Sequence, residues 1–209
     1  HTLENMQEIQ SGSIFENVNG GTIRNLTVEG LKLDSSTPSE TLHTGFVGTL
    51  NGSATLDHVF IVGSGNRKEV SVYGYGGALV GEVNNATVTN CGVRDMELTS
   101  KEIRKNTLYL GGLVGSLSAA QLNNCYAQGV TITAEAGYTA SGIGGLIGVQ
   151  GSGSVMNSLY AQGSIKTSFQ NAGGITGSAG SAISKAWTYV EINSIADNLG
   201  GIAGKLAAS

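Results

Sequence analysis

The chain has 209 residues, a length that suits one domain of ordinary size, and 33 of them are glycine against a single proline. Charged residues make up 12% and the formal net charge is −4, so the basic footprint of a nucleic-acid-binding protein is missing. Apolar residues reach 40%, yet no apolar run approaches the ~18 residues of a membrane-spanning helix. We therefore expect one folded module with no nucleic-acid partner and no membrane insertion.

Clusters in which glycines flank apolar residues recur along the whole chain. The last glycines of six clusters fall at positions 48, 81, 115, 148, 177 and 204, so the copies are 27 to 34 residues long. Two of the clusters read GGLVG, from Gly111 to Gly115, and GGLIG, from Gly144 to Gly148. This spacing indicates an internal repeat. We assign it to about residues 12–204 of a single module that spans residues 1–209.

A second kind of segment alternates with the glycine clusters and predicts strands. It combines Val, Ile, Thr and Tyr with flanking Gly, Asn and Ser, and it lacks helical spacing of its apolar residues. The motifs of ankyrin, tetratricopeptide and leucine-rich repeats are also missing. The sequence therefore predicts an all-β fold, a single right-handed parallel β-helix (β-solenoid) of about six coils. In chain order the strand segments are residues 22–28, 55–61, 87–93, 121–127, 155–161 and, more weakly, 182–188.

Alignment of the copies gives three columns with one residue from each coil. The first and third columns are apolar or small, as an inward-facing ladder requires. The second is rich in Asn, which tolerates the left-handed backbone of a tight corner and can bond to the next coil. In order, the columns are Leu26, Val59, Cys91, Cys125, Leu159 and Ala186; Asn25, His58, Asn90, Asn124, Ser158 and Lys185; and Phe46, Leu79, Leu113, Leu146, Ile175 and Ile202.

Residue patterns that would carry chemistry are missing. His1, His43 and His58 form no cluster with metal-ligand spacing, and Asp95 and Glu97 share a strand face without further acids in register. The glycine clusters lack the Gly-Lys-Ser/Thr and the following helix of a phosphate-binding loop. We therefore expect no catalytic residue, no metal ligand and no cofactor in this chain. A polysaccharide-processing β-helix enzyme is kept as an alternative.

The two cysteines share the first column. Adjacent strands would place the Cα atoms of Cys91 and Cys125 about 4.8 Å apart, which a disulfide tolerates. Stacked side chains leave a sheet in parallel, however, whereas a bridge needs a χ₃ near about ±90°. We therefore expect two reduced, inward-facing thiols.

Variable loops precede the glycine clusters, and two of them carry basic residues. Arg67 and Lys101 each lie 14 residues before the last glycine of the next cluster, so we expect their loops to stack on adjacent coils. The same count aligns Tyr75 with Tyr109. Such a basic patch with aromatic neighbours could hold a glycan or an acidic protein loop, unless the charges only solubilise protruding loops. The predicted binding residues are Arg67, Lys68, Tyr73, Lys101, Arg104, Lys105 and Tyr109.

The cluster from Gly111 to Gly115 and its counterpart from Gly144 to Gly148 resemble the GLUG repeat of secreted bacterial proteins. Together with the strand from Asn25 to Val28, the pattern is most similar to the β-helical region of streptococcal immunoglobulin A protease and its zinc metallopeptidase relatives. The resemblance implies an extracellular or cell-surface bacterial protein, a virulence factor, from which this module is excised. The zinc-binding His-Glu-x-x-His motif of that family does not occur here. The resemblance therefore implies zinc in the parent's catalytic domain only.

This resemblance sets the functional expectation. It implies a non-catalytic scaffold and substrate-positioning module of a secreted or wall-attached zinc metallopeptidase. The expected partners are a host glycoprotein such as immunoglobulin A, or adjoining domains of the parent chain, and the module is expected to be a monomer. The alternative is an adhesin or surface-fibre module that binds a host glycan or protein.

Overall fold

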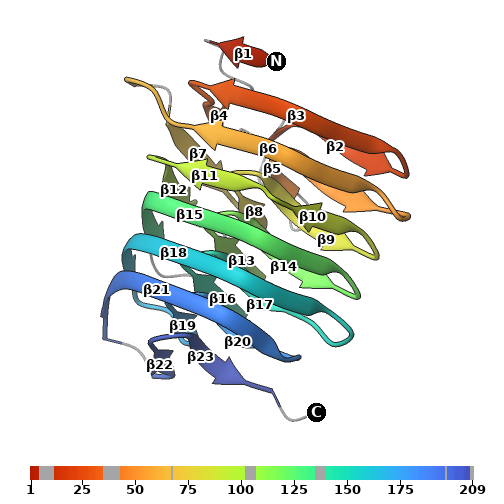
Figure 1. Ribbon diagram of the computed structural model, residues 1–209. Coiled ribbons are helices and arrows are strands. Elements are labelled where there is room, and N and C mark those ends of the chain that lie inside the picture. The colour runs from red at the N-terminus through yellow and green to blue at the C-terminus, as the bar shows by residue number, and fades with distance from the viewer. Residues whose placement is uncertain are drawn as a thin grey trace.

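The computed structural model describes residues 1–4, 12–34, 43–66, 68–101, 107–134, 140–195 and 197–207. These residues form strands and turns, and no helix occurs among them. The strands stack in parallel coils, as Figure 1 shows. This confirms the all-β, β-solenoid prediction, while the right-handed sense of the winding stays a prediction.

Two sheets contain all the strands of the described ranges. The first sheet consists of β1 (Thr2–Glu4), β3 (Thr22–Glu29), β4 (Leu33–Asp34), β6 (Thr55–Val62), β7 (Glu69–Val72), β10 (Thr87–Thr89), β11 (Gly92–Arg94), β12 (Glu97–Ser100), β15 (Gln121–Ala134), β18 (Val155–Thr167) and β21 (Ile183–Ser194). The second consists of β2 (Ser13–Asn19), β5 (His43–Asn51), β8 (Tyr75–Gly77), β9 (Val80–Asn84), β13 (Thr107–Gly111), β14 (Val114–Ser118), β16 (Ala140–Gly144), β17 (Ile147–Gln150), β19 (Ala172–Gly173), β20 (Thr176–Ala179), β22 (Leu199–Gly200) and β23 (Ala203–Leu206).

One ladder of the first sheet runs through the whole stack. It passes in order from β3 to β6, β10, β15, β18 and β21, which gives six rungs in the described part of the chain. β1 pairs with β3 and adds a short strand at the N-terminal end. The two termini therefore lie at opposite ends of the stack (Figure 1).

The glycine clusters bend the chain between strands of the second sheet, for example between β13 and β14 and between β16 and β17. Close approach of the backbone explains why these positions are glycine. A Cβ at Gly144 would collide with the carbonyl oxygen of Ile147, while the carbonyl of Ile175 on the next coil approaches from another side. The clusters are thus a steric solution to a tight bend, as the sequence predicted.

The apolar columns line the core. From Phe46 to Ile175 the third column is fully buried, and the first column is almost fully buried from Val59 to Leu159. Burial falls off only at the ends of the stack, where Leu26 and Ala186 are partly buried and Ile202 is 39% exposed. A central coil has a neighbour on both sides, whereas an end coil has one.

The corner column adopts the backbone that its asparagines predicted. All six of its residues have φ between 51° and 56°, in the left-handed region, even where the side chain is His, Ser or Lys. The corner is therefore set by the fold of the coil. Asn is the residue type that occupies it at the lowest conformational cost among the non-glycine residues found there.

Truncation of a central core residue should destabilise the stack strongly. Leu113 lies in the third column and is fully buried, so Leu113→Ala should lower the free energy of unfolding by about 2–5 kcal/mol through lost burial and a residual cavity. Denaturant unfolding followed by circular dichroism measures this. Thr131→Ala, on the exposed face of β15, is the matched control and should change the free energy by less than about 0.5 kcal/mol. Equal effects of the two substitutions would contradict the assignment of the third column to the core.

Candidate functional site

Among the described members of the predicted basic patch, the structure brings Lys101 and Tyr73 together and leaves Lys68 apart from them. Lys68 Nζ lies 2.6 Å from a carboxylate oxygen of Glu97, and Lys101 Nζ forms an ion pair with Asp34. Lys101 also lies over the ring of Tyr73, 5.5 Å from its centroid. Both described lysines are therefore held by carboxylates. Arg67, Arg104 and Lys105 lie outside the described residues.

The level expected for Lys101, that of the residue 14 before Gly81, is wrong. Ser100 pairs with Val72, so Lys101 is level with Tyr73 at the end of the β7 and β12 pair. The carbonyl of Lys68 accepts a hydrogen bond from the amide of Glu97, at the start of the same pair. Four residues of strand separate Lys68 from Lys101 along this direction.

The cause is a six-residue connection that lies at one corner in one coil and at a different corner in the next coil. In one coil six residues join β6 to β7 and two join β7 to β8. In the next coil two residues join β11 to β12 and six join β12 to β13. Counting back from the glycine cluster assumes equal spacing at every corner, so it cannot detect the exchange.

The predicted alignment of Tyr75 with Tyr109 is confirmed, and His43 extends it. These residues pair in register on β5, β8 and β13. Each neighbouring pair of rings packs edge to face with centroids 5.0 Å apart. Three successive coils therefore carry a short aromatic ladder on the second sheet.

His43 joins this ladder to a hydroxyl on its own strand, β5, and to a carboxylate on β9 of the next coil. Its Nδ1 lies 2.9 Å from Thr49 Oγ1 and its Nε2 lies 3.5 Å from Glu82 Oε2. Burial lowers the pKa of His43, against the opposing effect of the Glu82 carboxylate. Burial, followed by Tyr109 and Glu82, raises the pKa of Tyr75. The contact of the imidazole with Glu82 links β5 to β9 of the next coil.

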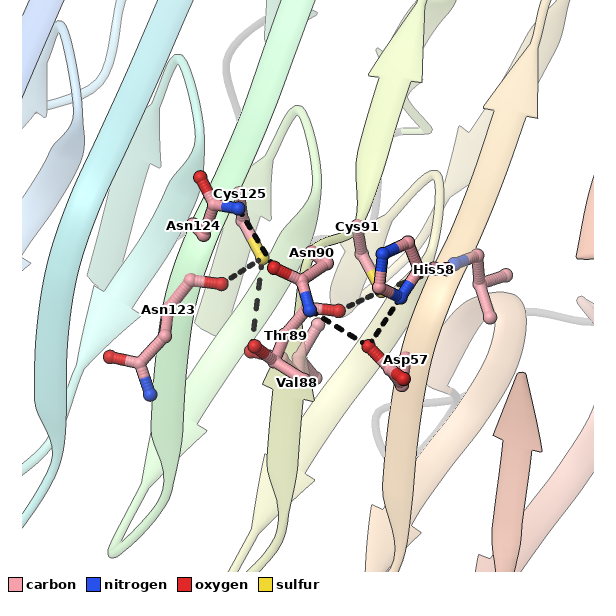
Figure 2. Close-up of polar contacts among 10 residues, drawn as sticks. Asp57, His58, Val88, Thr89, Asn90, Cys91, Asn123, Asn124 and Cys125 are labelled. Atoms are coloured by element: carbon pink, nitrogen blue, oxygen red, sulfur yellow. Dashed lines mark hydrogen bonds and ion pairs between the residues drawn. The ribbon is translucent and has the colours of Figure 1, made fainter. Parts of the chain in front are cut away.

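The Asn corner forms a hydrogen-bonded ladder across three coils (Figure 2). Asn124 Nδ2 donates to Asn90 Oδ1 at 2.8 Å, and Asn90 Nδ2 donates to Asp57 Oδ1 at 2.9 Å. His58 Nδ1 lies 2.7 Å from the same Asp57 oxygen. The hydrogen bond from Asn90, followed by that from His58, holds the pKa of Asp57 below its ordinary value. The predicted bonding of stacked Asn side chains is therefore confirmed.

Cys91 and Cys125 are free and buried, as predicted. The two thiols donate to the carbonyls of Thr89 and Asn123 at 3.1 and 3.2 Å. Burial raises the pKa of Cys125 well above that of an ordinary thiol. The hydrogen bond with Cys125 lowers the pKa of Cys91 instead. Both side chains are buried in the core column, and the raised pKa makes Cys125 a poor nucleophile and a poor metal ligand.

The sequence analysis missed a column of aromatic residues on the outer face of the first sheet. Tyr126, Tyr160 and Trp187 pair in register on β15, β18 and β21. Phe60 lies on the same column two coils before Tyr126, and Gly92 lies between them. The centroids of the Phe60 and Tyr126 rings are 6.3 Å apart. The column is unlike the buried ones because its side chains face away from the core, and Trp187 is 60% exposed.

An open cavity of about 550 Å³ lies beside this column. Aromatic rings line it together with amide and hydroxyl side chains, and none of the lining residues is charged. They are Asn124, Cys125, Tyr126, Gln128, Ser158, Leu159, Tyr160 and Trp187. The signal in the sequence was the near-identical repeat of Tyr-Ala-Gln-Gly at residues 126–129 and 160–163, which the alignment of copies used only to define the period.

A metal-binding group of three or more His, Cys, Asp or Glu residues does not occur within the described ranges. The same ranges contain no helix long and apolar enough to cross a membrane.

One family model matches the chain. The GLUG motif matches residues 106–133, which cover β13, β14 and most of β15. No curated protein and no solved structure matches. The chain therefore contains a GLUG repeat within a β-solenoid, as its glycine clusters predicted.

Substitution of Asn90 should separate its two roles in the corner. Asn90→Ala and Asn90→Gly both remove the hydrogen bond to Asp57, so in both variants the pKa of Asp57 should rise toward its ordinary value. Only alanine should strain the backbone at φ 53°, so Asn90→Ala should be less stable than Asn90→Gly by about 1 kcal/mol. Carboxyl NMR titration and denaturant unfolding measure the two effects.

The sign of the pH effect follows from the lowered pKa of Asp57. The contribution of the ionised Asp57 side chain to stability should be complete above its unfolded-state pKa. That contribution should be lost as the pH falls through the folded-state pKa of Asp57. A pKa of Asp57 that is unchanged in both Asn90 variants would contradict the assignment of this hydrogen bond.

Thiol titration should count two free thiols after unfolding in denaturant without reductant, because both cysteines are free. In the native state both should react slowly, since they are buried. The Cys125→Ala variant should give one thiol under the same unfolding conditions. A count of zero in unfolded monomer would show that the two sulfurs form a disulfide.

Proposed function

We propose that this chain is a non-catalytic β-solenoid scaffold in a secreted or wall-attached bacterial zinc metallopeptidase of the immunoglobulin A protease type. The observation that supports it best is the unbroken stack of coils. One parallel ladder and one continuous core run from β3 to β21. Six rungs at ~4.8 Å make a rod of roughly 29 Å, a suitable spacer between domains.

Exposed apolar residues on the last coil favour the proposal that adjoining parts of the parent chain are the partners of this module. Tyr189, Ile195 and Leu206 are 79%, 95% and 75% exposed. Within the described ranges β21 pairs on one side only, with β18. Exposed apolar side chains beside an open strand edge favour cover by a further coil or a neighbouring domain.

In this proposal the module contributes position and the parent's catalytic domain contributes chemistry. The zinc and its ligands belong to that domain. The scaffold sets the distance between the peptidase, the cell surface and a host glycoprotein such as immunoglobulin A. It would act outside the cell, where its substrate is found.

The adhesin alternative is favoured by the outward-facing aromatic column and its neutral cavity. The basic patch gives it less support, because Lys68 and Lys101 are separated and paired with Glu97 and Asp34. The full parent sequence separates the two functions. A downstream His-Glu-x-x-His favours the metallopeptidase, and tandem coils without that motif favour the adhesin.

Deletion of residues 12–204 from the full-length parent should impair cleavage of an intact glycoprotein. The KM for immunoglobulin A should rise, because the scaffold that positions it is lost. The kcat and KM for a short peptide that spans the same scissile bond should stay unchanged. Both are measured by steady-state kinetics on the purified parent.

Two control outcomes sharpen this experiment. Leu113→Asp in the full-length parent should have the same effect as the deletion, because an unpaired buried charge unfolds the module. An unchanged KM for the intact glycoprotein in both variants would rule out the substrate-positioning role. Equal loss of peptide cleavage would show instead that the module belongs to the catalytic unit.

A further inference from the structure

The aromatic column stays accessible within the stack. Tyr126 and Tyr160 each have a coil on both sides, and both rings are still partly exposed. Trp187 on the following coil is 60% exposed. Three aromatic side chains on successive rungs are therefore accessible to solvent, and the rungs are about 4.8 Å apart along the solenoid axis.

A missing side chain on one coil makes room for the ring of Tyr126. Gly92 holds the place of the column between Phe60 and Tyr126, and a Cβ there would collide with the ring of Tyr126. The Tyr126 ring therefore covers Gly92 and packs toward Phe60, at 6.3 Å between centroids. The space between Tyr126 and the next coils remains part of the open cavity of about 550 Å³.

A β-bulge places an amide at the same cavity. The register between β15 and β18 shifts between Ala127 and Val130, so β15 has one more residue here than β18. Gly129 takes a φ of 65°, which glycine adopts without strain. Bulges redirect side chains next to functional sites. Gln128, the exposed residue before Gly129, lines the cavity.

From these observations we propose that the outer face of β15, β18 and β21 binds a neutral oligosaccharide that lies along the solenoid axis. The rings of Tyr126, Tyr160 and Trp187 stack on the apolar faces of successive sugar rings. The side chains of Gln128 and Asn124 bond to the hydroxyl groups. Amides supply both donors and acceptors, which matches hydroxyls, since these do the same.

The charge of the lining selects this ligand over others. None of the lining residues carries a charge, although the chain as a whole has a formal net charge of −4. The nearest charged residues are Arg94, level with Gln128, Asp95, whose carboxylate lies beside Gly129, and Lys185, level with Ser158, so both signs occur and no cluster of cations forms. An anionic polysaccharide would need a cluster of cations at the cavity. A peptide that adds a strand would pair with the open edge of β21, whereas the three rings lie on the face of the sheet.

This inference goes beyond the scaffold role and does not depend on the parent being a peptidase. The site is made by residues of this chain alone, and all of them lie within the described ranges. Binding across several coils also requires an intact stack, because each coil supplies one ring.

The test is isothermal titration of the chain with neutral hexasaccharides of different linkage, namely cellohexaose, maltohexaose, laminarihexaose, chitohexaose in its N-acetylated form and α-mannohexaose. At least one should bind, and binding should be insensitive to salt because no ion pair forms. Trp187→Ala and Tyr160→Ala should each weaken that binding by about tenfold or more, as loss of an aromatic anchor does. The side chain of Gln128 is exposed, so Gln128→Ala tests the site without disturbing the core.

Controls separate a binding defect from a folding defect. Phe15→Ala removes an aromatic ring that is 42% exposed on β2, in the second sheet, and should leave binding unchanged. Circular dichroism and the thermal midpoint of each variant check folding. If Trp187→Ala does not fold, Gln128→Ala decides, with an expected loss of several-fold.

Four outcomes would overturn the inference. The first is that none of the five sugars binds at millimolar concentration. The second is that binding persists unchanged in Trp187→Ala, Tyr160→Ala and Gln128→Ala. The third is that polygalacturonate or heparin binds more tightly than every neutral sugar and is released by salt, which would assign the face to an anionic ligand. The fourth is that self-association buries Trp187, as sedimentation would show, which would assign the face to a second copy of the chain.

Discussion

The structure depends on the parallel hydrogen-bonded register between one coil and the next. A strand in this ladder has no partner within its own coil, so its backbone groups are satisfied only by the neighbouring coils. Because the pairing is parallel and nearly in register, equivalent residues of successive coils come to lie directly over one another. Every column in the molecule, whether it faces inward or outward, is a consequence of this constraint.

Columns that face inward and columns that face outward have different roles in the molecule. The inward columns from Phe46 to Ile175 and from Val59 to Leu159 are almost fully buried and make the core. The corner column uses Asn90 and Asn124 to carry side-chain hydrogen bonds from coil to coil (Figure 2). The outward column of Tyr126, Tyr160 and Trp187 meets neither need. Aromatic side chains repeated at an exposed position have no role in the core, which is why that face is the strongest candidate for a ligand.

Repetition also explains where the functional variation lies. The glycine bends and the core columns are held by close backbone contacts, such as that of Gly144 with Ile147 and Ile175, and they tolerate little change. Insertions enter at the corners instead, and the six-residue connection follows β6 in one coil but β12 in the next. The bulge at Gly129 is a smaller change of the same kind, and it redirects Gln128 on the outer face.

The sequence by itself determined the repeat, the β-solenoid, the core columns and the left-handed corner. Each of these depends on a residue type that recurs at one period, and the period survives any error in strand boundaries. It also aligned Tyr75 with Tyr109, because both lie close to the glycine cluster from which they were counted. Only the tertiary structure decided that Lys68 and Lys101 lie apart, since the corner that takes an insertion depends on how the coils pair and not on how long they are. It also decided that Tyr126, Tyr160 and Trp187 share a cavity with Gln128. The direction of a side chain at a bulge, and the space left over Gly92, follow from packing between coils that are 27 to 34 residues apart in the sequence.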